Sequence, residues 1–353
     1  MRAIQIKRFS EIDLSDQFFD SLKADYVGFE GWFGRKAASE DLAYILDDED
    51  GALHAFLYLK IEDGADTEVV PSLPSARRLK LGTFKVDPHG TRLGERFLKI
   101  AIDQALKDDL EEIYVTAFEK HDKLIALFEL FGFNHHGVKT TESGTEQVFI
   151  KKLFETGREI VNGYPVINMG DNRVYVVGIK PGYHTKLFPD SKLNTENAND
   201  YISDVSHTNG IFKNYIGAAP GLRNLHKGDI IVIYRTKDDN AANAYYSSVL
   251  TSFCTVTDIK YPAEFSDFDE FYRYCKPYSV LSREELREYY ANKRSTVVTM
   301  VYNVAFKHRL TNRFIQEHIG KPEYWGFFEL QYSHLRTLIV ASGINARLFN
   351  WRG

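Results

Sequence analysis

Hydrophobic spacing along the first half of the chain alternates between strand-like and helix-like stretches. Apolar residues at every second position, or in short runs, predict strands at 4–8, 42–46, 52–61, 79–86, 112–118, 134–139 and 147–151. Apolar residues three and four positions apart predict helices at 13–26, 91–107 and 121–130. Loops are expected at 31–34 and in the acidic stretch 62–76. The predicted order is β-α-β-β-β-α-β-α-β-β.

The second half contains longer strands that are rich in β-branched and aromatic residues. They are predicted at 173–180, 230–235, 245–259 and 295–306, whereas 209–216 fits either a strand or a short helix. An aromatic and cationic loop is expected at 181–190. Helices are predicted at 282–292, 311–319 and 331–342, the first opened by the capping box Ser282-x-x-Glu285. The whole chain is therefore expected to be α+β.

Length and turn residues indicate how the chain is divided. At about 150 residues per domain, 353 residues predict two domains. Turn-forming residues cluster between the two halves, as in Asn162-Gly163-Tyr164-Pro165 and Gly170-Asp171-Asn172. We therefore expect a domain over 1–153, a linker over 154–171 and a second domain over 172–353.

The charge is distributed unevenly between these halves. The net charge is −5, but residues 1–153 carry 20 Lys and Arg against 28 Asp and Glu, whereas residues 154–353 carry 24 against 21. The first domain is thus acidic and the second slightly basic. The overall value argues against a strongly basic nucleic-acid binder, yet the second domain alone does not exclude such a partner.

Composition excludes several other classes. Hydrophobic residues make up 44% and charged residues 26%, which argues against disorder and coiled coil. Cys254 and Cys275 are the only cysteines, too few for a disulfide framework or a Cys-rich zinc site, and no metal-binding constellation is expected. The sequence starts without an apolar signal region and has no run of ~18 apolar residues, so we expect a cytoplasmic protein.

One segment of the first half has the arrangement of an anion site. A predicted strand ends at Val86, a turn with Pro88 and Gly90 follows, and a helix begins near Thr91. The first amides of such a helix lack partners and attract phosphate, and Arg92 and Arg96 can add charged contacts. An ordinary strand-to-helix turn with a surface helix end fits the same residues.

At this segment the chain resembles the GNAT family of acetyl-CoA-dependent N-acetyltransferases. Val86-Asp87-Pro88 matches the start of the family pattern, and Gly94 keeps its central glycine. Phe128-Glu-Leu-Phe-Gly132-Phe133 matches a later motif, and the element order also fits. The resemblance covers about residues 1–152.

The resemblance implies a mixed sheet in which the strands 79–86 and 112–118 separate, with the pantetheine arm of acetyl-CoA between them. It places the pyrophosphate on the amides from Arg92 to Arg96. The cofactor-binding residues that it implies are Phe84, Val86, Arg92, Leu93, Gly94, Glu95, Arg96, Lys120 and Lys123.

The sequence departs from the family at the positions that carry out catalysis. Phe128 stands where many members have a tyrosine that acts as the acid, and the strand before the phosphate loop offers no carboxylate as the base. Substitutes on or just after the second separated strand are Tyr114, Thr116 and Glu119. Each also fits an ordinary structural role, and a base acting through water would need none of them.

In the second half, Lys227-Gly228-Asp229 followed by the strand 230–235 resembles the PUA-like superfamily of small barrels, in its ASCH and EVE branches. The resemblance implies a β-barrel, here with added helices, that binds RNA or modified nucleotides through stacking aromatics and phosphate-binding cations. Candidates for those contacts are Tyr183, His184, Lys186, Phe188, Lys213 and Arg235. The alternative is that these residues form the barrel core and its solvated surface.

Together, these features predict an acetyl-CoA-dependent N-acetyltransferase whose PUA-like domain selects the substrate, for example a nucleic acid such as tRNA. Two alternatives remain open: a non-catalytic protein that senses acetyl-CoA and binds nucleic acid, which Phe128 favours, and an N-acetyltransferase of small amines.

Overall fold

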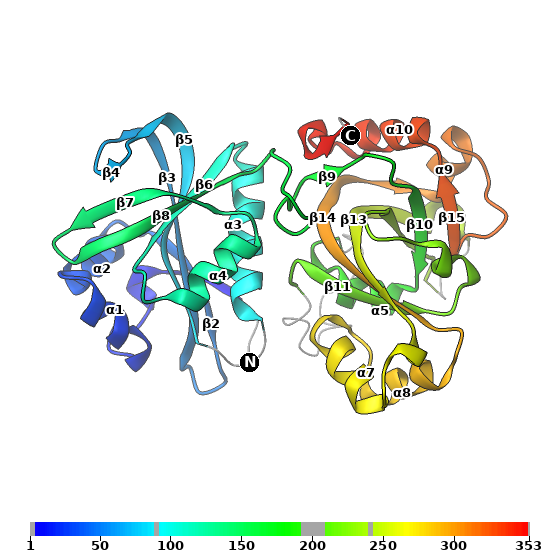
Figure 1. The fold of residues 1–353 in the computed structure, drawn as a ribbon, viewed down its shortest axis with the longest axis horizontal. Coiled ribbons are helices and arrows are strands. Elements are labelled where there is room, and N and C mark those ends of the chain that lie inside the picture. The colour runs from blue at the N-terminus through cyan, green and yellow to red at the C-terminus, as the bar shows by residue number, and fades with distance from the viewer. Residues whose placement is uncertain (1–3, 88–91, 192–208, 239–242, 352–353) are drawn as a thin grey trace. The chain divides into compact units, whose positions relative to one another are not determined.

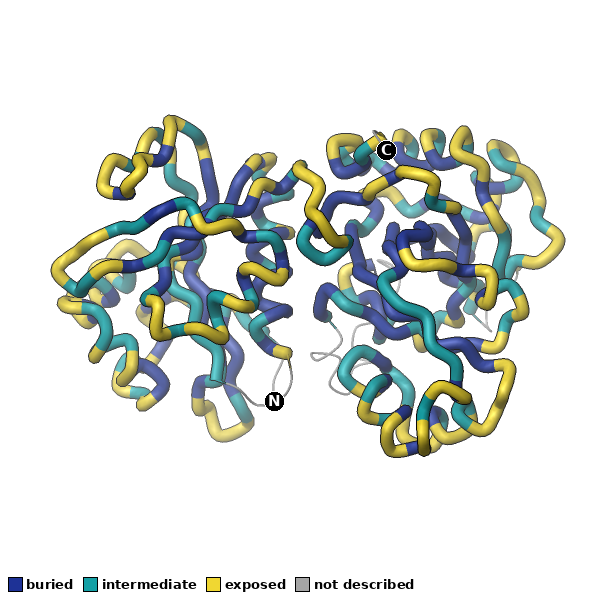
Figure 2. Tube along the Cα trace, in the orientation of Figure 1, coloured by how far each residue is buried: buried dark blue, intermediate teal, exposed yellow. Residues whose placement is uncertain are grey.

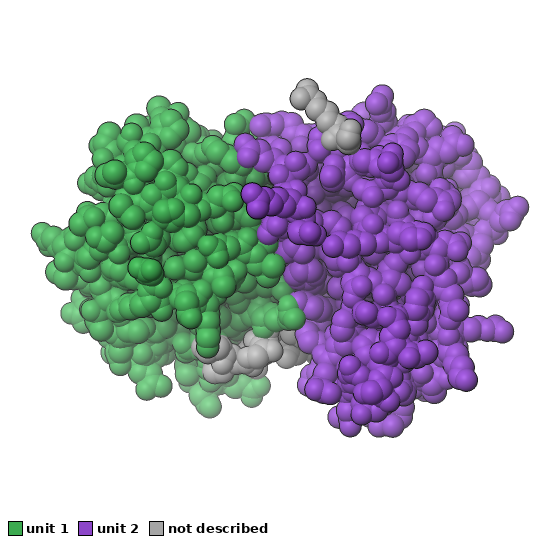
Figure 3. Space-filling view, viewed as in Figure 1, with its two compact units in different colours: residues 1–153 green, residues 154–353 purple. Residues whose placement is uncertain are grey.

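The computed structural model describes residues 4–87, 92–191, 209–238 and 243–351. The chain divides into two compact units, residues 1–153 and 154–353 (Figure 1; Figure 3). Residues 154–171, expected as a linker, are packed into the second unit. There, Tyr164 is fully buried, and the Asn303 side chain donates a hydrogen bond of 3.1 Å to the Pro165 carbonyl.

Unit 1 is built on an eight-stranded mixed sheet with the order β1-β2-β3-β5-β6-β8-β7-β4 (Figure 1). Its strands are β1 (Gln5–Arg8), β2 (Leu42–Asp47), β3 (Leu53–Asp66), β4 (Val69–Val70), β5 (Leu73–Val86), β6 (Glu112–Ala117), β7 (Asn134–Thr141) and β8 (Gly144–Lys152). Buried residues follow these strands, whereas many of the turns and loops are exposed (Figure 2).

The prediction of a loop at 62–76 is wrong, because β3 and β5 continue through it as the arms of one hairpin. Glu62 pairs with Arg78 and Asp63 with Arg77 across the two strands. Opposite charges at facing positions stabilise antiparallel strands, so the acidic stretch is matched by the basic residues that follow it.

β5 and β6 form a short parallel pair that opens along its length. The register runs from Leu79 opposite Ile113 to Leu81 opposite Val115 and then stops. β5 nevertheless continues to Val86 and β6 to Ala117. The two strands therefore separate, as the resemblance implies.

A β-bulge lies in β5 at the start of this separation. Tyr58 of β3 faces Thr83 and Leu59 faces Leu81, which leaves Gly82 as the extra residue. A Cβ atom on Gly82 would lie 2.7 Å from Cδ1 of Tyr58, so no other residue fits without movement of that ring. Bulges bend the strand that carries them, which directs the end of β5 away from β6.

The helices of unit 1 are α1 (Asp20–Asp25), α2 (Phe29–Ala38), α3 (Leu93–Lys107) and α4 (Asp122–Leu130). α3 packs on β3, β5 and β6. It buries Leu93, Phe97, Ala101 and Ala105, which are spaced at helical intervals. The turn 88–91, which holds part of the phosphate-loop motif, lies outside the described residues.

α2 replaces the loop expected at 31–34. Phe29 and Phe33 lie one helical turn apart and are both buried, and the Phe33 ring packs against the rings of Phe9 and Phe19. Burying each aromatic ring contributes about 1.5–3 kcal/mol. This outweighs the cost of about 1 kcal/mol for each of the two glycines in the helix.

Unit 2 contains a six-stranded mixed sheet with the order β11-β14-β13-β12-β10-β15. Its strands are β10 (Val174–Ile179), β11 (Phe212–Gly217), β12 (Ile230–Arg235), β13 (Val249–Lys260), β14 (Thr296–Thr311) and β15 (Phe327–Leu330), with a separate pair of β9 (Ile167–Asn168) and β16 (Phe349–Asn350). Within the described residues, no strand pairs the edges β11 and β15, so the sheet is open where a closed barrel was expected.

The helices of unit 2 are α5 (Pro181–Leu187), α6 (Ala244–Ser247), α7 (Phe268–Cys275), α8 (Arg283–Ala291), α9 (Asn312–His318) and α10 (Tyr332–Ser342). The capping box that opens α8 is confirmed: the Glu285 amide donates to Oγ of Ser282 at 3.1 Å and the Ser282 amide to Oε2 of Glu285 at 2.7 Å. α5 replaces the loop expected at 181–190 and begins with a proline at a position where its missing N–H costs nothing.

The described parts of the two units contain neither a candidate membrane-spanning helix nor a candidate metal site. No helix there is long and apolar enough to cross a membrane. No group of three or more His, Cys, Asp or Glu side chains in those parts could hold a metal ion.

A buried ion pair joins β5 to β6 below the point where they separate. Nε of Arg78 donates to Oε1 of Glu112 at 2.6 Å, and the two side chains are 2% and 5% exposed. The other Arg78 nitrogens donate to the carbonyls of Gly64 at 2.8 Å and Pro74 at 2.5 Å. The guanidinium therefore ties three segments together.

We predict that Arg78→Met lowers the free energy of unfolding by about 3 kcal/mol, because Glu112 stays buried with Lys152 as its remaining ion partner. Urea unfolding followed by circular dichroism measures the change. Arg77→Met is the matched control, since Arg77 is 55% exposed and its substitution should change stability by about 0.5 kcal/mol or less. Equal effects of the two substitutions would contradict the assigned role of Arg78.

Candidate functional site in unit 1

A cleft of about 990 Å³ opens in unit 1 where β5 and β6 separate. Residues 80–86 of β5 and 115–117 of β6 form its two inner walls. The α1–α2 segment, the start of α4 and the β7–β8 hairpin supply the rest of the lining. The cleft thus contains the space in which the resemblance places the pantetheine arm.

Five of the predicted cofactor-binding residues line this cleft: Phe84, Val86, Gly94, Lys120 and Lys123. The remaining four are absent from the lining. Leu93, Glu95 and Arg96 have buried side chains, and Arg92 lies at the N-cap of α3 with a left-handed φ of 51°. Their predicted contacts through main-chain amides stay a prediction.

Gly94 keeps the first turn of α3 close to α4. A Cβ atom at this position would lie 2.8 Å from Cδ2 of Leu127, another residue of the cleft lining. A larger residue would therefore have to push against Leu127 or extend into the cleft. The absence of a side chain at Gly94 therefore leaves room for a bound group to pass close to the backbone there.

The two lysines at the start of α4 differ in their partners. Nζ of Lys120 forms an ion pair with Asp25, which also lies 3.2 Å from Nε2 of His121. The Lys123 ammonium makes no hydrogen bond or ion pair with the residues that the structure describes. Lys123 therefore has its charge available for a phosphate group.

The three predicted catalytic residues are in different places. Tyr114 is buried outside the cleft, and its hydroxyl donates to Oε2 of Glu62. Burial first, and then that carboxylate, raise the pKa of Tyr114, which makes it a poor acid. Glu119 is exposed and also lies outside the cleft, so only Thr116 is part of the lining.

Thr116 leads to two residues that the sequence analysis missed, Glu146 of β8 and Tyr26 after α1. Oε1 of Glu146 accepts hydrogen bonds from the Thr116 hydroxyl at 3.0 Å and the Tyr26 hydroxyl at 2.9 Å. The carboxylate is 6% exposed, and its Oε2 accepts no hydrogen bond from any described residue. All three residues line the cleft.

In this arrangement only one oxygen of Glu146 is held by hydrogen bonds. The two hydroxyl donors fix the orientation of the carboxyl group and leave the other oxygen for a ligand. Burial first, and then the Glu146 charge, raise the pKa of Tyr26, so the tyrosine keeps its proton and remains a donor. Glu146 can therefore accept a proton from a group in the cleft.

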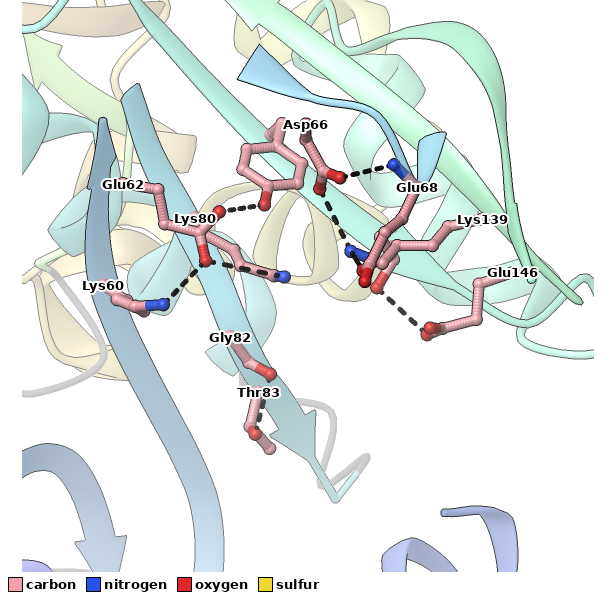
Figure 4. Close-up of polar contacts among 11 residues, drawn as sticks. Lys60, Glu62, Asp66, Glu68, Lys80, Gly82, Thr83, Lys139 and Glu146 are labelled. Carbon is pink, nitrogen blue, oxygen red and sulfur yellow. Dashed lines mark hydrogen bonds and ion pairs between the residues drawn. The ribbon is translucent and has the colours of Figure 1, made fainter. Parts of the chain in front are cut away.

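A network of charged residues lies beside this carboxylate (Figure 4). Nζ of Lys139, which faces Glu146 across β7 and β8, contacts Oδ2 of Asp66 at 3.0 Å and Oε2 of Glu68 at 2.8 Å. Burial would lower the pKa of Lys139, but these hydrogen bonds outweigh it and the pKa is raised. Lys139 thus stays charged in the wall of the cleft, where two carboxylates balance its charge.

Phe128 and the two adjacent histidines supply no acid at the cleft. Phe128 is fully buried between Phe84 and Phe133. Nε2 of His135 lies 2.7 Å from the side-chain oxygen of Gln147, and Nε2 of His136 lies 2.9 Å from the Pro71 carbonyl. Neither histidine is in the lining.

In unit 2, four of the six predicted nucleic-acid-binding residues are buried: His184, Phe188, Lys213 and Arg235. They take part in internal contacts. Nη1 and Nη2 of Arg235 bind both oxygens of Asp238 at 3.0 and 2.8 Å. The Lys213 ammonium lies over the ring of Phe188, with Nζ 5.7 Å from the ring centre.

The hydrogen bond and the pKa of His184 agree with its position in the core of unit 2. Its Nε2 lies 2.9 Å from Oγ1 of Thr251, and burial lowers the pKa of His184 to about 3, so it is neutral. Tyr183 and Lys186 of α5 reach the surface, Tyr183 with 36% exposure. Of the predicted set, these two can contact a macromolecule directly.

No protein-family model matches the sequence, and no curated protein matches it. Among solved structures, the chain is similar to the ASCH protein of Zymomonas mobilis, with 10% identity over 48% of this chain and 94% of that one and a TM-score of 0.33. It is also similar to the NatC complex bound to a Gag peptide and CoA, with 17% identity over 43% of this chain and 99% of that one and a TM-score of 0.30. Because both TM-scores are below 0.5, we build the functional proposal on the geometry of the cleft.

Proposed function

We propose that unit 1 is an N-acetyltransferase that uses acetyl-CoA. The observation that carries the proposal is the cleft between the separated strands β5 and β6, which combines an unpaired strand edge with a carboxylate, Glu146, that has a free oxygen.

The unpaired edge of β5 suits the amide groups of a pantetheine arm. Beyond Leu81, β5 still pairs with β3, but no described strand pairs with its other edge. Backbone N–H and C=O groups in such an edge need partners. Residues near Phe84 and Val86 can therefore bind the arm, while Gly94 gives it room and Lys123 meets its phosphates.

The chemistry needs a group that removes a proton from the acceptor. Acetyl-CoA bound in the cleft supplies an acetyl thioester, whose C–S bond breaks as a C–N bond forms to the acceptor amine. Oε2 of Glu146 takes the proton that the ammonium group must lose, while Tyr26 and Thr116 hold Oε1 in place. Glu146 can then give this proton to the leaving sulfur, and the second proton, which the nitrogen loses as the amide forms, passes to solvent.

This arrangement supports the catalytic alternative over the non-catalytic one. The non-catalytic alternative rested on Phe128, which has no proton to give. Glu146 supplies the missing function from β8, a strand outside the family motif. Both N-acetyltransferase alternatives, with a nucleic acid or a small amine as acceptor, are compatible with this site.

We predict that substitutions in the cleft separate cofactor binding from transfer. Glu146→Gln should lower kcat by about 10²–10⁴-fold, because a positioned base contributes that factor, and leave the Kd of acetyl-CoA unchanged. Gly94→Glu should abolish acetyl-CoA binding, because its side chain would enter the cleft beside Leu127. Isothermal titration calorimetry and release of free CoA thiol measure the two quantities.

Glu142→Gln is the matched control for the first substitution. Glu142 lies exposed in the turn between β7 and β8, four residues before Glu146, and should change neither quantity. If Glu146→Gln retains full turnover, Glu146 is not the base. If the parent protein binds no acetyl-CoA, the proposed function is wrong.

For unit 2 we propose a role in selecting the substrate, with RNA as the partner. The sequence resemblance to PUA-like barrels supports it, and so does the local structure of the motif. Oδ1 and Oδ2 of Asp229 accept the Arg173 and His226 amides at 3.0 and 2.8 Å, which fixes the start of β12. Gly228 precedes it with a φ of +97°, which glycine adopts without strain. We correspondingly propose that unit 2 has the curved fold of a PUA-like barrel, with α5 at its surface.

We predict that the full chain binds tRNA with an affinity that falls as salt rises, since phosphate contacts release counterions. Fluorescence anisotropy with labelled tRNA at two salt concentrations tests this. Lys186→Glu at a partly exposed position should weaken binding by about 10-fold, through the repulsion of one phosphate, whereas Lys321→Glu at an exposed position should not. Absence of binding at low salt would contradict the RNA proposal.

A further inference from the structure

The cleft carries a second charged group whose partners are incomplete, Lys80 of β5. Its side chain is 21% exposed and extends toward the side of the cleft on which Lys139 and Glu146 lie (Figure 4). Lys80 pairs with Tyr114 of β6, and the pairing of the two strands ends one residue later, at Leu81. It therefore lies in the cleft close to the point where the two strands separate.

Lys80 makes only weak contacts with the rest of unit 1. Its Nζ lies 3.8 Å from Oε1 of Glu62 and 5.2 Å from the centre of the Tyr114 ring. The first distance exceeds that of a hydrogen bond. Among the described residues, none accepts a hydrogen bond from this ammonium group, which has three N–H donors.

The neighbouring groups explain why Lys80 has no hydrogen-bond acceptor among the described residues. Oε2 of Glu62 is taken by the Tyr114 hydroxyl, and Oε1 accepts from Nζ of Lys60 at 3.0 Å. Asp66 is held by Lys139 at 3.0 Å. The carboxylates near Lys80 are therefore committed to other donors. Burial, the main cause, lowers the pKa of Lys80, as expected for a cation with too few partners.

Two groups of opposite charge in the cleft can thus each bind a ligand group. Glu146 offers a carboxylate oxygen that can bind an ammonium group. Lys80 offers N–H donors that form no hydrogen bond with a described residue, and its ion partner Glu62 is 3.8 Å away. A molecule that carries only an amine binds the carboxylate and leaves the partly buried Lys80 ammonium without a hydrogen-bond acceptor from the ligand.

We propose that Lys80 binds an anionic group of the acceptor, a carboxylate or a phosphate, so that the acceptor of unit 1 carries both a primary amine and an anion. This inference rests on the proposed acetyl transfer. It narrows the acceptor from amines in general to amines that carry a negative charge. Lys80 acts here in substrate binding, and the acetyl group is transferred to the acceptor amine.

Matched acceptors test the proposal on the full chain. The first pair is n-butylamine and γ-aminobutyrate, and the second is isoamylamine and leucine; each pair differs by one carboxylate. 3-Aminopropyl phosphate replaces the carboxylate with a phosphate and distinguishes the two sources of charge. Initial rates of CoA release give kcat and KM for each acceptor.

The expected result is a KM about 10–100-fold lower for at least one anionic acceptor than for its plain amine, the factor that a hydrogen bond to a charged group provides. Lys80→Met should remove this difference by raising the KM of the anionic acceptor to that of its plain amine. Lys80→Arg should restore part of it, because the cation is kept. Lys107→Met, at an exposed position near the end of α3, is the charge-matched control.

Several results would overturn the inference. Equal KM values within both pairs and for the phosphate would show that Lys80 binds no anion, while the proposed acetyl transfer would stand. A loss of kcat for every acceptor in Lys80→Met would assign Lys80 to catalysis or folding; thermal melting of the variant separates the two. Acetylation of Lys80 itself, detected by mass spectrometry, would identify it as an acceptor. Transfer to none of the acceptors would overturn the proposed function as well.

Discussion

The end of the parallel pairing between β5 and β6 is the constraint on which the site depends. Pairing stops at Leu81 and Val115, and two features confine the separation to that point. Below it, the buried Arg78–Glu112 ion pair holds the strands together. Above it, the Gly82 bulge bends β5 away. The result is an unpaired strand edge inside the sheet, which is a site for an extended ligand with amide groups.

Burial determines what the polar groups around this opening can do. A buried carboxyl group such as that of Glu146 needs hydrogen-bond partners, and the Tyr26 and Thr116 hydroxyls donate to one of its oxygens only. Lys80 is in the opposite position, because the carboxylates nearest to it are held by other donors. One spare acceptor and one spare donor in the same cleft select for a ligand that carries both charges.

The sequence predicted the parts of the fold that depend on local spacing. The helix α3 and most of the order of elements along unit 1 follow from periodicity, whereas the separation of β5 from β6 was expected from the family resemblance. It failed where tertiary contacts outweigh local preference, as in α2. Glu146 was missed for another reason: β8 has apolar residues on both faces, so alternation gave no sign that this carboxylate faces a cleft. In unit 2, charge and aromatic content suggested a surface, whereas His184, Phe188, Lys213 and Arg235 are internal.

A crystal structure of the full chain with CoA bound tests the central claim most directly. The account predicts that the pantetheine arm lies between β5 beyond Leu81 and β6 beyond Val115, with its sulfur on the side of the cleft that holds Glu146 and Lys80. An arm bound elsewhere on unit 1, or one whose sulfur lies far from Glu146, would contradict it.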